Sequence, residues 1–282
     1  MRDLILGSAQ FGKGYGTYIK SPEISKSNLA GILNLANSYG IDLIDTSLNY
    51  SGVTKKLASQ NLSKKFKIGT KIEFKSNNQL LILKKLKNNL TRFNLGFYES
   101  ILIHNWATLS EQERINGINF LYKLRDLGFS KKIGLSVYDT KELSRLSKKI
   151  DIIQAPLNYF NLLFLNDKKV FAMKEHGTEF HARSIFHQGT LINHSNLPHH
   201  FKKEILKFKM FSKQFKLSYL QGALSIFDSQ EIFSKLVVGI NTREELFEII
   251  NCPVSNSKVN LSSIEASTST KFKDPRTWRK NL

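Results

Sequence analysis

Short apolar runs alternate with longer amphipathic segments along most of this 282-residue chain. The apolar runs have four to six residues, which is typical of strands buried on both faces of a parallel sheet. The predicted strands are residues 4–7, 41–45, 66–71, 100–104, 132–136, 150–154, 179–183 and 235–239. This alternation predicts a parallel α/β protein.

The segments between the apolar runs carry apolar residues near helical spacing. Helices are predicted over residues 27–39, 78–93, 111–127, 140–149 and 242–250. The last of these begins after Thr242, a suitable N-cap residue. Its first turn contains Glu244 and Glu245, where the helix dipole favours acidic side chains.

Two architectures fit the alternation, a doubly wound sheet and a closed barrel. Gly12, Gly14 and Gly16 form G-x-G-x-G, not the G-x-G-x-x-G that opens a helix in dinucleotide-binding sheets. A (β/α)8 barrel needs about 250 residues, which this chain supplies. We therefore predict a single-domain (β/α)8 TIM barrel over residues 1–250, followed by a C-terminal extension over residues 251–282.

The composition excludes several classes of protein. No apolar run approaches the roughly 18 residues of a membrane-spanning helix, and the apolar run near the N-terminus is too short for a signal peptide. We therefore expect a cytoplasmic protein without a membrane partner. Cys252 is the only cysteine, so no intrachain disulfide and no cysteine metal cluster can form, and no metal site is predicted.

The chain is strongly basic, with 42 Lys and Arg residues against 23 Asp and Glu and a formal net charge of +19. Such a charge can indicate a nucleic-acid-binding protein. The lysines are spread along the whole chain, however, and no known nucleic-acid-binding motif appears. We interpret them mainly as solvated surface residues and expect no nucleic-acid partner. A second interpretation is that they steer an anionic cofactor or substrate toward the site.

Three ionisable residues each close a predicted strand: Asp45, Lys71 and His104. Tyr50 follows Asp45 by five residues, in the loop that leaves the second strand. The carboxyl ends of barrel strands meet at one face, where barrel active sites lie. Each residue alone also has a structural explanation, such as a helix N-cap for Asp45 or packing for Tyr50. Their convergence at one mouth favours a catalytic set.

These four side chains suit the reduction of a carbonyl group. Hydride addition builds negative charge on the carbonyl oxygen, which then needs a proton. A phenol, with an ordinary pKa of about 10, is a poor acid unless a nearby ammonium lowers that value. We therefore expect Tyr50 to be the general acid, Lys71 to lower its pKa and Asp45 to hold Lys71. His104 would orient the substrate oxygen.

The same residues resemble the aldo-keto reductase superfamily over nearly the whole chain. The segment Gly40-Ile41-Asp42-Leu43-Ile44-Asp45-Thr46-Ser47, followed by Tyr50, is similar to the family signature, and Gly69-Thr70-Lys71 and Leu102-Ile103-His104-Asn105 resemble its lysine and histidine strands. The resemblance implies the catalytic tetrad Asp45, Tyr50, Lys71 and His104. It also implies a nicotinamide-dependent oxidoreductase that acts on a small carbonyl substrate.

The resemblance further implies positions that bind the cofactor. Ser136 and Gln154 would contact the nicotinamide carboxamide, and Arg183, beside Ser184, would stack on the nicotinamide ring. The positions that would hold the adenosine phosphates at the start of the last helix are Gly239, Asn241, Thr242 and Arg243. Ordinary turn and cap chemistry is the alternative interpretation of Gly239 and Thr242.

Two departures from the family pattern affect these expectations. Val137 stands where many members have Asn, which weakens one carboxamide contact. Glu245 stands where many NADP-using members have Arg, and its carboxylate would repel a 2′-phosphate, although the nearby Arg243 could attract one. Family habit and the basic surface favour NADP, with NAD as the alternative.

The substrate is the property that the sequence predicts least well, because substrate specificity in such barrels is determined by the loops. Phe11 and Trp106 are predicted to line the substrate pocket, with Tyr15 and Phe160 as further aromatic candidates. The segment Asp274-Pro275-Arg276-Thr277-Trp278 resembles a C-terminal element of bacterial members associated with sugar metabolism. The resemblance thus points to a sugar-derived aldehyde or ketone. The alternative is a catalytically weak nucleotide-binding barrel that acts as a regulator or scaffold. The oligomeric state stays open.

Overall fold

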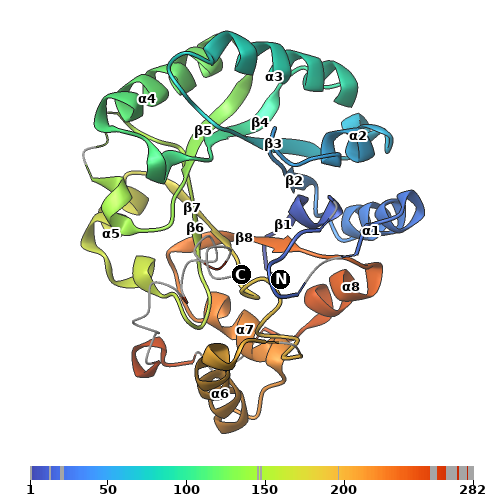
Figure 1. Ribbon diagram of the computed structural model, residues 1–282, viewed down its shortest axis with the longest axis vertical. Helices are drawn as coiled ribbons and strands as arrows, with labels where there is room; N and C mark the ends of the chain where they lie inside the picture. Colours follow the sequence, from blue (N-terminus) through green and yellow to red (C-terminus); the bar gives the residue numbers. More distant parts are fainter. Residues whose placement is uncertain are drawn as a thin grey trace.

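The strands form a closed parallel barrel in chain order, in which β8 pairs with β1 (Figure 1). The computed structural model describes residues 2–12, 14–19, 22–144, 146, 148–195, 197–254, 259–264, 272 and 278. Its strands are β1 (Leu4–Gly7), β2 (Leu43–Asp45), β3 (Lys67–Ile72), β4 (Tyr98–Ile103), β5 (Ser130–Ser136), β6 (Ile152–Pro156), β7 (Glu179–Arg183) and β8 (Phe233–Gly239). The predicted single-domain (β/α)8 barrel is confirmed, and each strand overlaps its predicted range.

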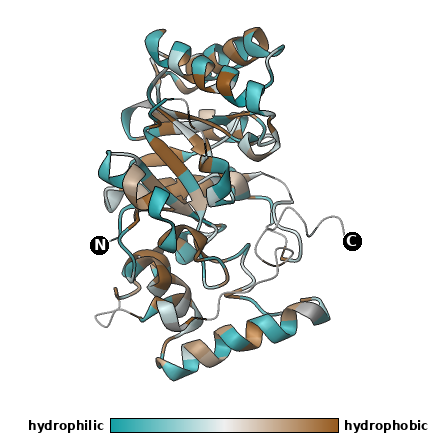
Figure 2. Ribbon diagram, turned by 90° about the vertical axis from the view of Figure 1, so that its left-hand side faces the viewer, coloured by the Kyte–Doolittle hydropathy of each residue, from teal (hydrophilic) through white to brown (hydrophobic). Residues whose placement is uncertain are grey.

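Helices surround this barrel on the outside (Figure 1). Those in the described part of the chain are α1 (Lys26–Ser38), α2 (Val53–Ala58), α3 (Gln79–Phe93), α4 (Glu111–Asp126), α5 (Lys168–Glu175), α6 (His199–Gln214), α7 (Tyr219–Asp228) and α8 (Arg243–Asn251). Figure 2 shows mainly apolar strands in the interior and many hydrophilic positions on the outer helices. No helix among the described residues is long and apolar enough to cross a membrane.

The prediction of a helix over residues 140–149 is wrong. The structure has a short 3-10 helix, Thr140–Leu143, after which Ser144 adopts an extended conformation. The carbonyl oxygen of Glu142 accepts a hydrogen bond from the indole Nε1 of Trp106 at 2.8 Å, so it serves a tertiary contact instead of a helix amide. Local propensity is overridden here by packing against the preceding loop.

Gly134 of β5 lies in a tight position between the neighbouring strands β4 and β6. A Cβ atom built at this position would lie 2.5 Å from the carbonyl oxygen of Ile152 and 2.9 Å from the side chain of Leu102. Two neighbouring strands therefore leave no room for a methyl group, and one of the two obstacles is backbone that cannot rotate away.

We expect Gly134→Ala to lower the free energy of unfolding by about 1–3 kcal/mol, because the barrel must shift to admit the methyl group. The matched control is Gly96→Ala, since no atom lies within 4 Å of a Cβ built there and its φ is not positive. Urea unfolding followed by circular dichroism measures both variants. Equal midpoints for the two would contradict the tight approach of β5 and β6.

The C-terminal residues that the structure describes pack back onto the barrel loops. Phe272 and Trp278 are buried, and the rings of His187 and Phe201 lie within 5.1 Å of both. His187 also contacts the carbonyl oxygen of Phe272 through Nε2 at 2.9 Å, and burial lowers its pKa to about 4. A neutral imidazole therefore ties this tail to the loop after β7. Residues 274–277 of the predicted sugar-related element lie outside the described residues.

Candidate active site

The four residues of the predicted tetrad meet at the carboxyl end of the barrel. Asp45 is the last residue of β2, Lys71 lies near the end of β3, and His104 directly follows β4. Tyr50 lies in the turn between β2 and α2. All four line one cavity of about 660 Å³.

Asp45 and Lys71 form a buried ion pair in the wall of this cavity. Lys71 Nζ donates to Asp45 Oδ2, and the side chains are only 3% and 12% exposed, respectively. Gln154 Nε2 donates to the other oxygen, Asp45 Oδ1, at 2.9 Å. Burial lowers the pKa of Lys71, and the carboxylate of Asp45 opposes that shift. The pair is thus held in place by a third side chain.

Tyr50 lies between the other members of the set. Its ring centroid is 5.9 Å from Lys71 Nζ and 6.2 Å from the His104 ring, which it meets edge to face. Burial raises the pKa of Tyr50, the charge of Asp45 raises it further, and Arg183 lowers it. In the protein alone, burial therefore outweighs the lowering of this pKa expected from Lys71, whose ammonium is paired with Asp45. Tyr50 is a neutral phenol that carries a proton.

Ser136 and Gln154, the predicted carboxamide contacts, line the cavity beside the tetrad. Gln154 uses its Nε2 on Asp45, and its buried Oε1 has no hydrogen-bond partner among the described residues. A buried acceptor without a partner is costly unless a ligand or water satisfies it. Gln154 therefore has one acceptor available for an N–H group in the cavity.

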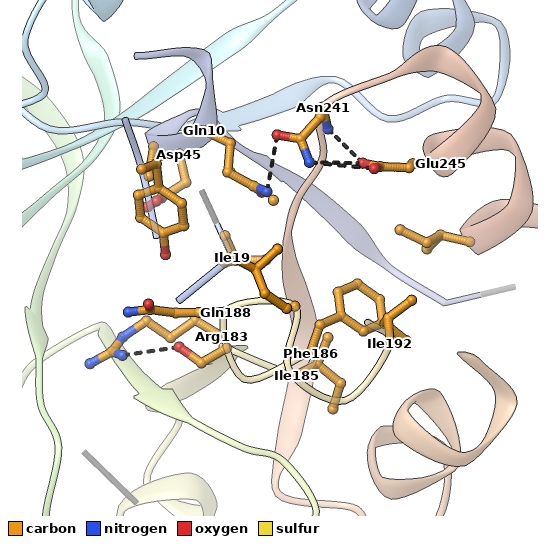
Figure 3. A pocket seen from close by; sticks show the side chains of 18 of the residues that line it. Gln10, Ile19, Asp45, Arg183, Ile185, Phe186, Gln188, Ile192, Asn241 and Glu245 are labelled. Atoms are coloured by element: carbon orange, nitrogen blue, oxygen red, sulfur yellow. Dashed lines mark hydrogen bonds between the residues drawn. The ribbon is translucent and has the colours of Figure 1, made fainter. Parts of the chain in front are cut away.

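Arg183 reaches the cavity from the end of β7 but already stacks on a protein ring. Its guanidinium lies 4.0 Å from the centroid of Tyr138, and its Nη2 donates to the carbonyl oxygen of Val137 at 3.0 Å. Ser184 lines the cavity next to it, with its Oγ 3.4 Å from Arg183 Nη1 (Figure 3). Tyr138 is a cavity residue that was not expected from the sequence, although it stands only two residues after Ser136 at the end of β5.

The opposite end of the cavity is formed by the start of α8. Gly239 and Asn241 line it, and Gln10 Nε2 donates to Asn241 Oδ1 at 3.4 Å (Figure 3). A Cβ atom built at position 239 would collide with Oε1 of Gln10, so a side chain there would displace Gln10 from its place in the cavity wall.

The other two residues predicted to bind phosphate do not belong to the cavity lining. Thr242 caps α8 by accepting a hydrogen bond from the Glu245 amide at 3.1 Å, as predicted for an N-cap. The aliphatic part of Arg243 extends toward α1, 3.9 Å from where a Cβ of Gly31 would lie. The alternative of cap chemistry therefore describes Thr242 better than phosphate binding does.

The predicted aromatic residues of the substrate pocket fall into two groups. Tyr15 lines the cavity. Phe11, Trp106 and Phe160 are buried in the core and do not line it. Trp106 is held by its bond to Glu142, and Phe160 packs 4.5 Å from the ring of Phe272. The expectation that Phe11 and Trp106 form the pocket is therefore corrected, since their rings complete the packing beneath the loops.

Two loops that are far apart in the sequence meet at the cavity. The amide of Thr17 donates to Gln188 Oε1 at 3.1 Å, and Ile19 lies against Gly189. Ile19, Gln188 and Gly189 all belong to the lining. Because these contacts join segments about 170 positions apart, no local pattern could have indicated them.

A closed (β/α)8 barrel with a cavity at the carboxyl ends of its strands, lined by buried titratable side chains, is typical of barrel enzymes. The sequence matches the model of the Aldo/keto reductase family over residues 3–249, so the chain belongs to that family. No curated protein matches it.

Similar solved structures share the fold at low sequence identity. An aldo-keto reductase from Bacillus halodurans (holo form) has a TM-score of 0.72 at 13% identity, covering 96% of this chain and 95% of that one. The glycerol dehydrogenase from Gluconobacter oxydans has a TM-score of 0.70 at 18% identity, with 91% and 87% covered. A Bombyx mori aldo-keto reductase in complex with NADP has a TM-score of 0.63 at 15% identity, with 93% and 86% covered.

Proposed function

We propose that this protein reduces a small aldehyde or ketone with a nicotinamide dinucleotide, and that Tyr50 is the general acid. The observation that carries this proposal is the convergence of Tyr50, His104 and the Asp45–Lys71 pair at one end of a single cavity. Membership of the aldo-keto reductase family supports it at the level of an oxidoreductase.

The residues present fit a nicotinamide group. The Oε1 of Gln154, which has no hydrogen-bond partner in the part of the chain that the structure describes, offers an acceptor for the carboxamide N–H. Ser136 supplies a hydroxyl on the neighbouring strand. When bound, the dinucleotide supplies the hydride. Gln154 would thereby link the nicotinamide to the tetrad, because its Nε2 donates to the carboxylate of Asp45.

We propose that side chains of the tetrad donate the proton that the reduced carbonyl oxygen needs. Reduction of the carbonyl carbon would move the C=O π pair to the oxygen, which would take the proton of the Tyr50 hydroxyl. His104 would orient the carbonyl oxygen toward that hydroxyl. Tyr50 is left as phenolate close to the Lys71 ammonium, 5.9 Å from its ring, until solvent returns the proton. The Asp45 carboxylate keeps that ammonium in place.

For the substrate we propose a hydroxylated carbonyl compound, such as one derived from a sugar. Polar groups that can bind hydroxyls line the cavity around Tyr50, including His104, Tyr138 and Arg183, and Tyr15 adds a further hydroxyl to the lining. The resemblance of the C-terminal segment to sugar-associated members supports this class, as does a glycerol dehydrogenase among the similar structures.

Fluorescence titration of the purified protein with NADH and NADPH, followed by a panel of sugar aldehydes and ketones, tests the function. We expect saturable binding of at least one dinucleotide and its carbonyl-dependent oxidation. Absence of binding to either dinucleotide would contradict the proposal. Tight binding without turnover on any carbonyl would favour the alternative of a regulator or scaffold, for which the departure at Val137 is the sequence argument.

A further inference from the structure

We propose, building on the proposed function, that this cavity selects NAD(H) over NADP(H), and that Glu245 is the residue that makes the choice. The sequence-based preference for NADP rested on family habit and on the net charge of +19. The distribution of charge inside the cavity argues for the opposite preference.

The two ends of the cavity differ in chemistry (Figure 3). The reacting end holds Tyr50, Lys71 and His104. The end formed by α8 is lined by Glu245, Glu248 and Ile249, and Ile192 lies on the same side (Figure 3). These residues provide two carboxylates and apolar side chains suited to an adenine ring. A dinucleotide with its nicotinamide at Tyr50 therefore extends its adenosine toward the two glutamates of α8.

Glu245 places a carboxylate at the loop that leads into α8, just before the N-cap Thr242. Its Oε2 accepts from the backbone amide of Asn241 at 2.6 Å, and both carboxylate oxygens lie 3.3–3.4 Å from Asn241 Nδ2 (Figure 3). The amides at a helix N-terminus favour negative charge, and here the protein supplies that charge itself. A 2′-phosphate has to compete with a carboxylate that is already bound.

Among the described residues that line the cavity, the Lys and Arg side chains are Lys71 and Arg183, and both lie at the reacting end. Lys71 is also paired with Asp45. A 2′-phosphate beside Glu245 and Glu248 thus meets like charge, whereas a ribose 2′-hydroxyl can donate to a carboxylate, as in other dinucleotide sites. Surface lysines beyond about 8 Å are screened at physiological salt, so the local carboxylates decide the preference.

The test is the dissociation constant of each dinucleotide for the protein without substrate, measured by nicotinamide fluorescence at about 0.15 M salt. We expect NADH to bind at least about tenfold more tightly than NADPH. Glu245→Gln keeps a capping side chain and removes one charge, so it should tighten NADPH binding about tenfold relative to NADH. Glu244→Gln, in the same first turn but outside the cavity, is the matched control and should leave the ratio unchanged.

The outcomes separate this inference from the proposed function. Equal or tighter binding of NADPH by the unmodified protein would overturn the inference and leave the proposed function standing. An unchanged ratio in Glu245→Gln would remove Glu245 from the selection. If neither dinucleotide binds, both the inference and the proposed function are contradicted.

Discussion

Replacing Tyr50 with phenylalanine is expected to lower kcat for carbonyl reduction by about 10²–10⁴-fold, the range typical of a lost general acid. The substitution removes only the hydroxyl, and the ring keeps its contacts with His104 and Lys71. The dissociation constant of the dinucleotide should therefore stay nearly unchanged. Steady-state kinetics and fluorescence titration of the same preparation measure the two quantities.

A matched control for this prediction is Tyr39→Phe, which removes the hydroxyl of a tyrosine at the end of α1, outside the cavity lining. It should retain full activity. A Tyr50→Phe variant as active as the unmodified protein would exclude Tyr50 as the proton donor.

The pH dependence of the reduction rate follows from the protonation of Tyr50. The pKa of Tyr50 is raised above the ordinary value for tyrosine of about 10, chiefly by burial. The protonated form, which reduction requires, therefore persists as the pH rises to at least 10. A fall in reduction rate between about pH 8 and 9 that disappears in Tyr50→Phe would show a lowered pKa in the working enzyme.

Replacing Lys71 with methionine is expected to lower the free energy of unfolding by about 3–5 kcal/mol and to abolish turnover. The variant leaves the carboxylate of Asp45 buried, with only the Gln154 amide to offset its charge. The cost comes mainly from that uncompensated charge and only in part from the lost attraction. Urea unfolding at neutral pH measures the change in stability.

The double variant Asp45→Asn with Lys71→Met separates structure from catalysis. Removing both charges should recover most of the stability lost in Lys71→Met, because a neutral amide replaces the unpaired carboxylate. Turnover should not return, since the ammonium beside Tyr50 is still missing. Full stability in the single Lys71→Met variant would contradict the buried pair.

The strands and the convergence of Asp45, Tyr50, Lys71 and His104 at one cavity could be predicted because both depend on local patterns. Short apolar runs ending in Asp45, Lys71 and His104 identify strand ends, and parallel topology alone brings such ends together. The N-cap Thr242 also follows from local chemistry. Helix α7 begins with a comparable local signal, a capping box between Ser218 and Gln221.

The remaining features depend on contacts between distant segments. Trp106 was expected in the pocket, but it is buried in the core, where its indole donates a hydrogen bond to the carbonyl oxygen of Glu142. The same bond engages a carbonyl of the segment that was expected to be helical. Tyr138 and Gln188 reach the cavity through their contacts with Arg183 and Thr17. The raised pKa of Tyr50 depends on burial, which a strand pattern does not report. Loops and electrostatics thus required the three-dimensional structure.

Transfer of deuterium from NADH that carries deuterium at both C4 positions of the nicotinamide to a carbonyl substrate, followed by mass spectrometry of the product, tests the central claim. Direct hydride transfer at the Tyr50 end of the cavity predicts an alcohol with one deuterium on its carbinol carbon, formed about 10²–10⁴-fold more slowly by Tyr50→Phe than by the unmodified protein. An alcohol without deuterium, or labelled alcohol formed equally fast by both proteins, would contradict this account of the site.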